Sequence, residues 1–169
     1  SGFAFTRSGD LLAAAGPRIV SLDAKTLAVK ATFTAPGAAF AASPLAFTWQ
    51  GRELIAAPAH DGRVFLLDAK LPAAPLAVTP AISTAKGRTQ PALASWEDET
   101  QTRYIFLASG AAKESLAALK LTGDSAKPDL QKVWSTGDFG LPSAPIAVNG
   151  AVFALKPGAP NTPAVLYAF

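Results

Sequence analysis

Two short polar clusters are the places where this sequence offers groups that could do chemistry. His60 is the only histidine of the chain and precedes Asp61, an order that suggests a general base with a carboxylate beside it. The segment 96–99 (Trp-Glu-Asp-Glu) holds three neighbouring carboxylates, which are the oxygen ligands that Ca²⁺ prefers. Both clusters also have the composition of turns. We therefore interpret His60 as a turn residue and segment 96–99 as a polar hairpin tip.

Other kinds of site are excluded by residue counts. The chain has no cysteine, so a disulfide, a thiolate metal site and a cysteine nucleophile are excluded, and one histidine does not make a zinc site. No phosphate-binding glycine motif occurs. The 15 Lys and Arg residues exceed the 12 Asp and Glu residues, but they are scattered, so we expect no nucleic-acid binding.

The size and composition fit one domain. The chain has 169 residues, of which 50% are hydrophobic, and no apolar run has the roughly 18 residues that a transmembrane helix needs. It has no methionine, so we expect Ser1 to follow processing or to lie inside a longer protein.

The clearest local pattern lies between Ala41 and Ala69. Three apolar segments there are separated by Gln50-Gly51 and by residues 60–62 (His-Asp-Gly), which are turn sequences that join neighbouring strands. The second and third segments are apolar without alternation, which is typical of strands covered on both faces. We therefore expect Phe65 and Leu67 to be buried between sheets.

Copies of this pattern recur along the chain. The leucine that marks the third strand is Leu22, Leu67 and Leu119, with Ala168 in the equivalent place, at spacings of 45, 52 and 49 residues. Four antiparallel strands in a repeat of this length are typical of a β-propeller blade. The sequence therefore predicts an all-β protein with blades at about 2–35, 43–83, 90–137 and 142–169, the last one strand short.

The predicted strands follow from apolar runs between turn signals. In chain order they are Phe3–Thr6, Leu11–Ala15, Arg18–Ala24, Val29–Thr34, Pro44–Trp49, Arg52–Ala59, Arg63–Ala69, Leu76–Ile82, Ala92–Trp96, Arg103–Ser109, Ser115–Leu121, Leu130–Ser135, Pro145–Val148, Ala151–Lys156 and Ala164–Phe169. The Pro-rich segment before Ile82 predicts a short or outer strand there. Residues 110–114 and 123–129 are polar and are predicted to be loops.

The third strands also carry a family resemblance. Residues 22–26 (Leu-Asp-Ala-Lys-Thr), with Phe33 further on, resemble the PQQ-like (quinoprotein-type) β-propeller repeat, and residues 67–69 (Leu-Asp-Ala) match its first half. Leu27 and Phe33 stand where that repeat has a glycine and a tryptophan that docks on the next blade, and Trp134 resembles this tryptophan. The resemblance implies that five residues have blade-docking roles: Asp23, Thr26, Phe33, Asp68 and Trp134.

The resemblance has further implications. Quinoprotein dehydrogenases of this fold hold PQQ near the propeller axis with Ca²⁺ or a lanthanide, a carboxylate base and, in many, two adjacent cysteines, none of which maps onto this sequence residue by residue. Four residues stand where strand ends or turns could face a central funnel, namely Arg18, Ser21, Asp23 and Arg63. The family also implies export to the periplasm or beyond.

We therefore expect a non-catalytic binding or scaffold module, part of a larger exported protein, with an unknown protein or small molecule as its ligand. A segment of a PQQ-dependent dehydrogenase is the alternative enzyme interpretation. Because family members have seven or eight blades, we favour half of a longer propeller. Two copies that close one ring, in which a second copy replaces the remaining blades, and a self-contained ring of four blades are the other arrangements.

Overall fold

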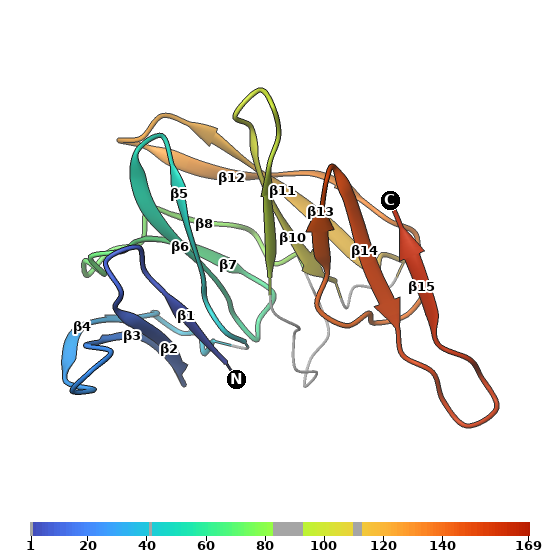
Figure 1. Cartoon of the computed structure of the whole chain (residues 1–169), viewed down its shortest axis with the longest axis horizontal. Helices are drawn as coiled ribbons and strands as arrows, with labels where there is room; N and C mark the ends of the chain where they lie inside the picture. Colours follow the sequence, from blue (N-terminus) through green and yellow to red (C-terminus); the bar gives the residue numbers. More distant parts are fainter. Residues whose placement is uncertain (1, 41, 83–92, 110–112) are drawn as a thin grey trace.

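The computed structural model describes residues 2–40, 42–82, 93–109 and 113–169, and these form fifteen strands in four antiparallel sheets (Figure 1). Blade 1 contains β1 (Phe3–Phe5), β2 (Leu11–Ala15), β3 (Arg18–Leu22) and β4 (Val29–Thr34). Blade 2 contains β5 (Leu45–Trp49), β6 (Arg52–Pro58), β7 (Val64–Asp68) and β8 (Ala77–Val78). Blade 3 contains β9 (Ala94–Glu97), β10 (Arg103–Ala108), β11 (Leu116–Gly123) and β12 (Pro128–Ser135). Blade 4 contains β13 (Ile146–Val148), β14 (Ala151–Lys156) and β15 (Val165–Ala168).

Each sheet is a meander in which strands that follow one another in the chain pair side by side. This confirms the predicted all-β fold, including the fourth sheet with three strands. The strands β2, β4 and β14 have the predicted bounds, and β8 is a two-residue outer strand as the prolines around it predict. The predicted blade and strand boundaries at residues 83 and 90–92 lie outside the described residues, as do residues 110–112 of a predicted loop.

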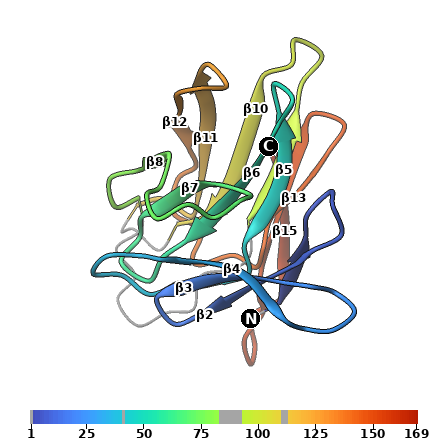
Figure 2. The same cartoon turned by 90° about the vertical axis from the view of Figure 1, so that its left-hand side faces the viewer.

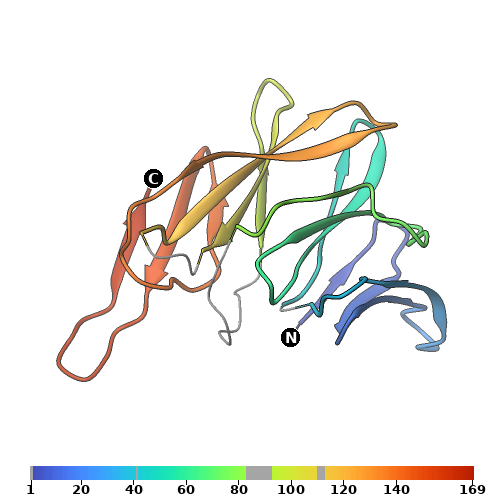
Figure 3. The same cartoon turned by 180° about the vertical axis from the view of Figure 1, so that it is seen from behind.

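The four sheets follow one another around an arc. The first strands of successive blades are neighbours, since β1 contacts β5, β5 contacts β9 and β9 contacts β13. These strands therefore lie innermost and the later strands of each blade lie outward. Figure 2 views the arc from the blade 1 end, and Figure 3 shows from behind that blades 1 and 4 are at its two ends. This is the radial arrangement of propeller blades.

The hairpin turns have the geometry that their sequences predict. Gln50 and Gly51 have φ values of 48° and 77°, and Asn149 and Gly150 have φ values of 48° and 80°. Two consecutive left-handed residues form the type I′ turn that suits the twist of paired strands. Residues 60–62 form a longer turn, closed by the Ala59 amide donating to the Arg63 carbonyl at 2.8 Å.

One predicted loop is shorter than predicted. Of residues 123–129, only 124–127 lie between the strands, because β11 continues to Gly123 and β12 begins at Pro128. The Asp124 carboxylate accepts the amides of Ala126 and Lys127, both at 2.9 Å, and so closes the turn within four residues. Polar composition predicted the turn but not how far the strands extend on either side of it.

The hydrophobic core lies between the blades. Blade 2 has both faces covered, and its side chains alternate between the two neighbours. The side that packs on blade 3 is formed by Leu54, Ala56, Val64 and Leu66. The side that packs on blade 1 is formed by Ile55, Ala57, Phe65 and Leu67. Phe65 and Leu67 are each 1% exposed, which confirms the burial that the continuous apolar runs predicted.

The turn after β3 places a leucine in a left-handed conformation. The Asp23 amide donates to the Ala28 carbonyl, and the Leu27 amide donates to the Asp23 carbonyl. This closure requires a φ of +58° at Leu27, whose side chain is 61% exposed. Leu71 follows β7 in a related turn with a φ of +50°, but it is buried. A side chain costs about 1–2 kcal/mol in this region.

Replacing Leu27 with glycine should raise the free energy of unfolding by about 0.5 kcal/mol, because relief of the left-handed strain exceeds the added entropy of the unfolded glycine. Urea denaturation measures the difference. Leu71→Gly is the matched control and should lower the stability by about 1–3 kcal/mol, because it also removes a buried side chain. A Leu27→Gly protein that unfolds at lower urea than the wild type contradicts this account.

Candidate functional site

A polar cleft of about 670 Å³ lies between blades 1 and 2. Both blades contribute to its walls, together with the β5–β6 turn. The residues that line it are Thr6, Ser8, Asp10, Ser21, Lys30, Ala31, Gly51, Arg52, Glu53, Asp68, Ala69 and Lys70. Because most of these side chains are polar or charged, the cleft suits a ligand that offers hydrogen bonds and charge.

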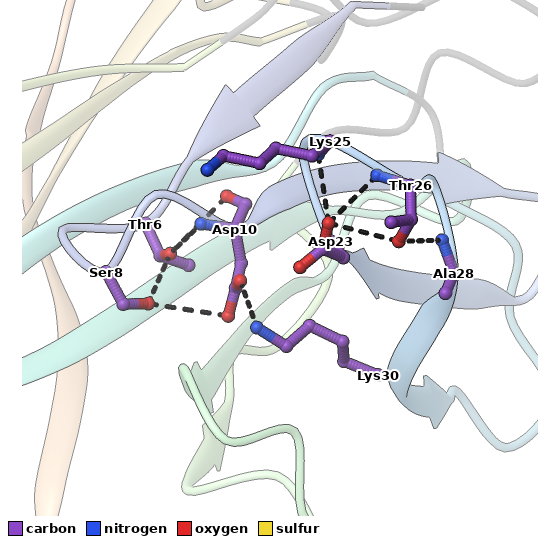
Figure 4. Close-up of polar contacts among 8 residues, drawn as sticks. All are labelled: Thr6, Ser8, Asp10, Asp23, Lys25, Thr26, Ala28 and Lys30. Carbon is purple, nitrogen blue, oxygen red and sulfur yellow. Dashed lines mark hydrogen bonds and ion pairs between the residues drawn. The ribbon is translucent and has the colours of Figure 1, made fainter.

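Blade 1 builds its side of the cleft from the β1–β2 turn. The Thr6 amide donates to the Asp10 carbonyl, and the Thr6 hydroxyl accepts the Asp10 amide, both at 2.9 Å. These bonds fix the turn so that the Ser8 hydroxyl lies 3.4 Å from the Asp10 carboxylate, and the Lys30 ammonium from β4 lies 2.6 Å from the same carboxylate (Figure 4). The hydrogen bond from Lys30 to Asp10 raises the pKa of Lys30 above its usual value.

Blade 2 builds the other side from two adjacent residues that reach in opposite directions. The Arg52 guanidinium pairs with Asp68 at 2.7 Å and also donates to the Ser125 carbonyl at 2.6 Å, at the tip of the β11–β12 hairpin. The Glu53 carboxylate accepts the amide of Arg7 from blade 1. The cleft residues therefore also connect blades 1, 2 and 3.

The three carboxylates of the cleft all have specific partners. Asp10 holds Lys30, Asp68 holds Arg52 and the amide of Lys70, and Glu53 holds the amide of Arg7. Each carboxylate thus stabilises a turn or a contact between blades. Lys70 is exposed at the cleft and has no ion pair within the described part of the chain.

Asp23 and Thr26, two of the residues with predicted docking roles, form one turn beside the cleft (Figure 4). The Asp23 carboxylate accepts the Thr26 amide at 2.9 Å, the Lys25 amide at 3.0 Å and the Thr26 hydroxyl at 3.1 Å. These bonds lower the pKa of Asp23 below its usual value, and the bond from the Thr26 amide has the largest effect. The contacts are within the turn after β3, so the structure gives both residues a turn-forming role.

The other three residues with predicted docking roles lie at different places. Phe33 is fully buried between blades 1 and 2, with ring centroids 6.1 Å from Phe65 and 6.3 Å from Phe40. Asp68 ends β7 and forms the ion pair with Arg52. Trp134 is half-buried on blade 3, where its ring lies 6.0 Å from that of Phe106 and 6.4 Å from that of Phe169 beyond β15.

The aromatic face of blade 3 was not predicted as a unit. Trp96 and Tyr104 are directly opposite each other on β9 and β10, with their rings 6.2 Å apart and 19° from parallel. Tyr104, Phe106 and Trp134 continue the row, and a groove of about 390 Å³ follows it. The only sequence signal was the aromatic alternation at Tyr104 and Phe106, since Trp96 and Trp134 reach the same face through strand pairing.

The two polar clusters of the sequence form turns. His60 is exposed in the turn between β6 and β7, where Asp61 instead pairs with Arg63 at 2.6 Å. Burial opposes ionisation of Asp61, but hydrogen bonds from Arg63 outweigh it and lower the Asp61 pKa. In segment 96–99, Glu97 pairs with Arg103 and Asp98 accepts two amides and a hydroxyl within its own hairpin.

The residues proposed to face a central funnel do not converge. Arg18 and Arg63 stand at the start of the third strands, whereas Asp23 follows the end of β3, and the third strands are not the innermost ones. Ser21 is buried beside the cleft. Within the described ranges, no three His, Cys, Asp or Glu side chains gather as metal ligands.

Comparison with known proteins supports the fold. No family model and no curated protein matches the chain. A solved structure of BBS1N in complex with ARL6DN is similar over 95% of this chain, with a TM-score of 0.56 and 14% identity. BBS1N is a β-propeller. The chain has the β-propeller fold. It spans 49% of that BBS1N chain, and a likeness at this identity concerns the fold alone.

In the part of the chain that the structure describes, no helix has the length and apolar character to cross a bilayer.

The packing of Phe33 gives a test of the contact between blades 1 and 2. Phe33→Ala should lower the free energy of unfolding by about 3–5 kcal/mol, because it leaves a cavity beside Phe40 and Phe65. Val133→Ala, at a side chain that is 42% exposed, is the control and should change it by less than about 0.5 kcal/mol. Chemical denaturation of both variants checks the difference, and similar effects from the two would contradict the docking role.

The pKa of Asp23 predicts a pH dependence. Because the folded protein lowers this pKa, the carboxylate stabilises the fold above the unfolded value of about 3.9, and the contribution disappears as the pH falls through the folded value. Asp23→Asn should therefore be less stable than the wild type at pH 6, and the two stabilities should converge below about pH 4. Thermal unfolding at several pH values measures this, and a pH-independent difference is the contrary result.

Proposed function

We propose that this chain is a non-catalytic binding or scaffold module built of PQQ-like β-propeller repeats. The observation that carries the proposal is the cleft between blades 1 and 2, in which Asp10, Glu53 and Asp68 each hold a cation or a backbone amide. A general acid or base must exchange its proton with a substrate, whereas a carboxylate fixed in this way keeps the shape of a surface. The cleft therefore serves recognition.

The chemistry of the cleft indicates the class of ligand. Its walls present hydroxyl groups from Ser8 and Thr6, the ammonium group of Lys70 and paired charges of both signs. A peptide segment of a partner protein matches such a surface, because it supplies backbone donors and acceptors along its length together with side-chain charges. BBS1N, which has the same fold, was solved in complex with ARL6DN, and this supports a protein ligand at the level of fold analogy.

The assignment to PQQ-like repeats is supported by the turn after β3. The Asp and Thr of the Leu-Asp-Ala-x-Thr sequence are bonded to each other there, and the Asp68 carboxylate accepts the Lys70 amide at 2.8 Å in the same way that Asp23 accepts that of Lys25. The shared bond explains why aspartate recurs at the end of both third strands. It is a structural role and does not require the quinone.

Selection of peptides from a phage-displayed random library tests the cleft. Peptides that bind the wild type should lose at least about tenfold in affinity for Ser8→Trp, in which the indole fills the cleft between the blades. Gln131→Trp places the same side chain on the exposed outer strand of blade 3 and is the matched control. Selected peptides that bind both variants as well as the wild type would show that the cleft is not the binding site.

A second measurement separates recognition from catalysis. The protein is mixed with PQQ and Ca²⁺, and dye-linked oxidation of primary alcohols is followed together with the quinone absorbance. We expect no oxidation above that of the free cofactor. Oxidation that requires the protein would overturn the non-catalytic assignment in favour of the dehydrogenase interpretation.

A further inference from the structure

The face of blade 1 that points away from blade 2 is mostly apolar. Ala4, Leu12 and Phe33 pack toward blade 2, so the residues that alternate with them point to the other side. Strand pairing places them in three rows across the sheet. The outer face of blade 1 consists of Phe3, Phe5, Leu11, Ala13, Ala15, Arg18, Val20, Leu22, Val29, Thr32 and Thr34. Phe3 and Phe5 are 67% and 63% exposed.

The face of blade 4 that points away from blade 3 has the same character. Val152 and Ala154 pack toward blade 3, and the residues that alternate with them are again apolar. The outer face of blade 4 consists of Ile146, Val148, Ala151, Phe153, Leu155, Leu166 and Ala168. Ile146 and Leu166 are 62% and 65% exposed. A continuous exposed apolar sheet face of this kind marks an interaction surface.

Both faces resemble the faces that are already paired inside the chain. Each contact between consecutive blades joins one apolar sheet face to another, as where Phe33 of blade 1 meets Phe65 of blade 2. The outer faces stand at the two ends of the arc (Figure 1). The outer face at one end of the arc is therefore the kind of apolar surface that could cover the outer face at the other end.

We propose that two copies of this chain associate head to tail, with the outer face of blade 1 of each copy against the outer face of blade 4 of the other. The two contacts close one ring of eight sheets. Eight blades are within the range of known propellers. The chain spans 49% of the BBS1N propeller chain, so two copies supply about the length of one such chain.

Electrostatics permits this contact. Arg18, which is exposed at the start of β3, is the one charged side chain among the eighteen on the two faces, so nearly all of the charged residues lie on other surfaces. A two-fold axis along the centre of the ring relates the copies, and closure leaves no blade face uncovered. An open chain of copies would leave one such face at each end.

Sedimentation equilibrium of the full chain gives the first test. The wild type should have twice the mass of the 17.3 kDa chain and no larger species. A protein that stays monomeric at concentrations up to 100-fold above the roughly micromolar dissociation constants of weak complexes would overturn the proposal. The two faces would then be expected to pack against blades of a different chain or segment. A series of growing oligomers would overturn ring closure.

Single charges on each face test the pairing. Phe5→Glu on blade 1 and Leu166→Glu on blade 4 should each raise the dimer dissociation constant by more than about tenfold, since a glutamate would be buried without a partner. Gln131→Glu adds the same charge on blade 3 outside both faces and should leave the dimer intact. Circular dichroism confirms that each variant is folded.

Mixing the two variants distinguishes head-to-tail pairing from face-to-self pairing. In the mixed ring one contact joins two unmodified faces and the other collects both glutamates. An equimolar mixture should therefore form more dimer than either variant alone. If only one variant disrupts the dimer and mixing changes nothing, the copies pair through a single face, and the ring proposal is wrong.

Discussion

The packing of apolar sheet faces between consecutive blades is the constraint on which the rest of the structure depends. A single blade cannot bury its own faces, because a meander of four strands is one layer thick. Blade 2 satisfies this requirement on both sides, with Leu54 and Leu66 toward one neighbour and Ile55 and Leu67 toward the other. The arc is therefore a stack whose stability comes from contacts between units, as in other repeat proteins.

The polar features are arranged around this stack. At the margin of the contact between blades 1 and 2, Asp10, Glu53 and Asp68 satisfy ammonium, guanidinium and amide groups where the apolar core ends. The hydrogen bonds and ion pairs of these carboxylates lie at the edge of the apolar core and also form the walls of the cleft. This is why a polar cleft lies directly beside the contact between Phe33 and Phe65.

Much of the fold could be predicted from the sequence because strands and turns have local signals. The apolar run of β6 indicated a strand covered on both faces, and Asn149-Gly150 indicated a type I′ turn. The cleft could not be predicted, because Glu53 meets Arg7 and Arg52 meets Ser125 only after three blades have packed together. The left-handed leucines were also missed, since leucine gives no local signal for a positive φ.

The reach of Arg52 and Glu53 has a consequence for how the chain unfolds. These consecutive residues fasten blade 2 to the hairpin tip of blade 3 on one side and to the start of blade 1 on the other. In a linear array with nearest-neighbour coupling, the unit coupled on both sides opens last. Amide hydrogen exchange should therefore be slowest in β6 and β7 and faster toward the terminal sheets, so that the molecule frays from its ends inward.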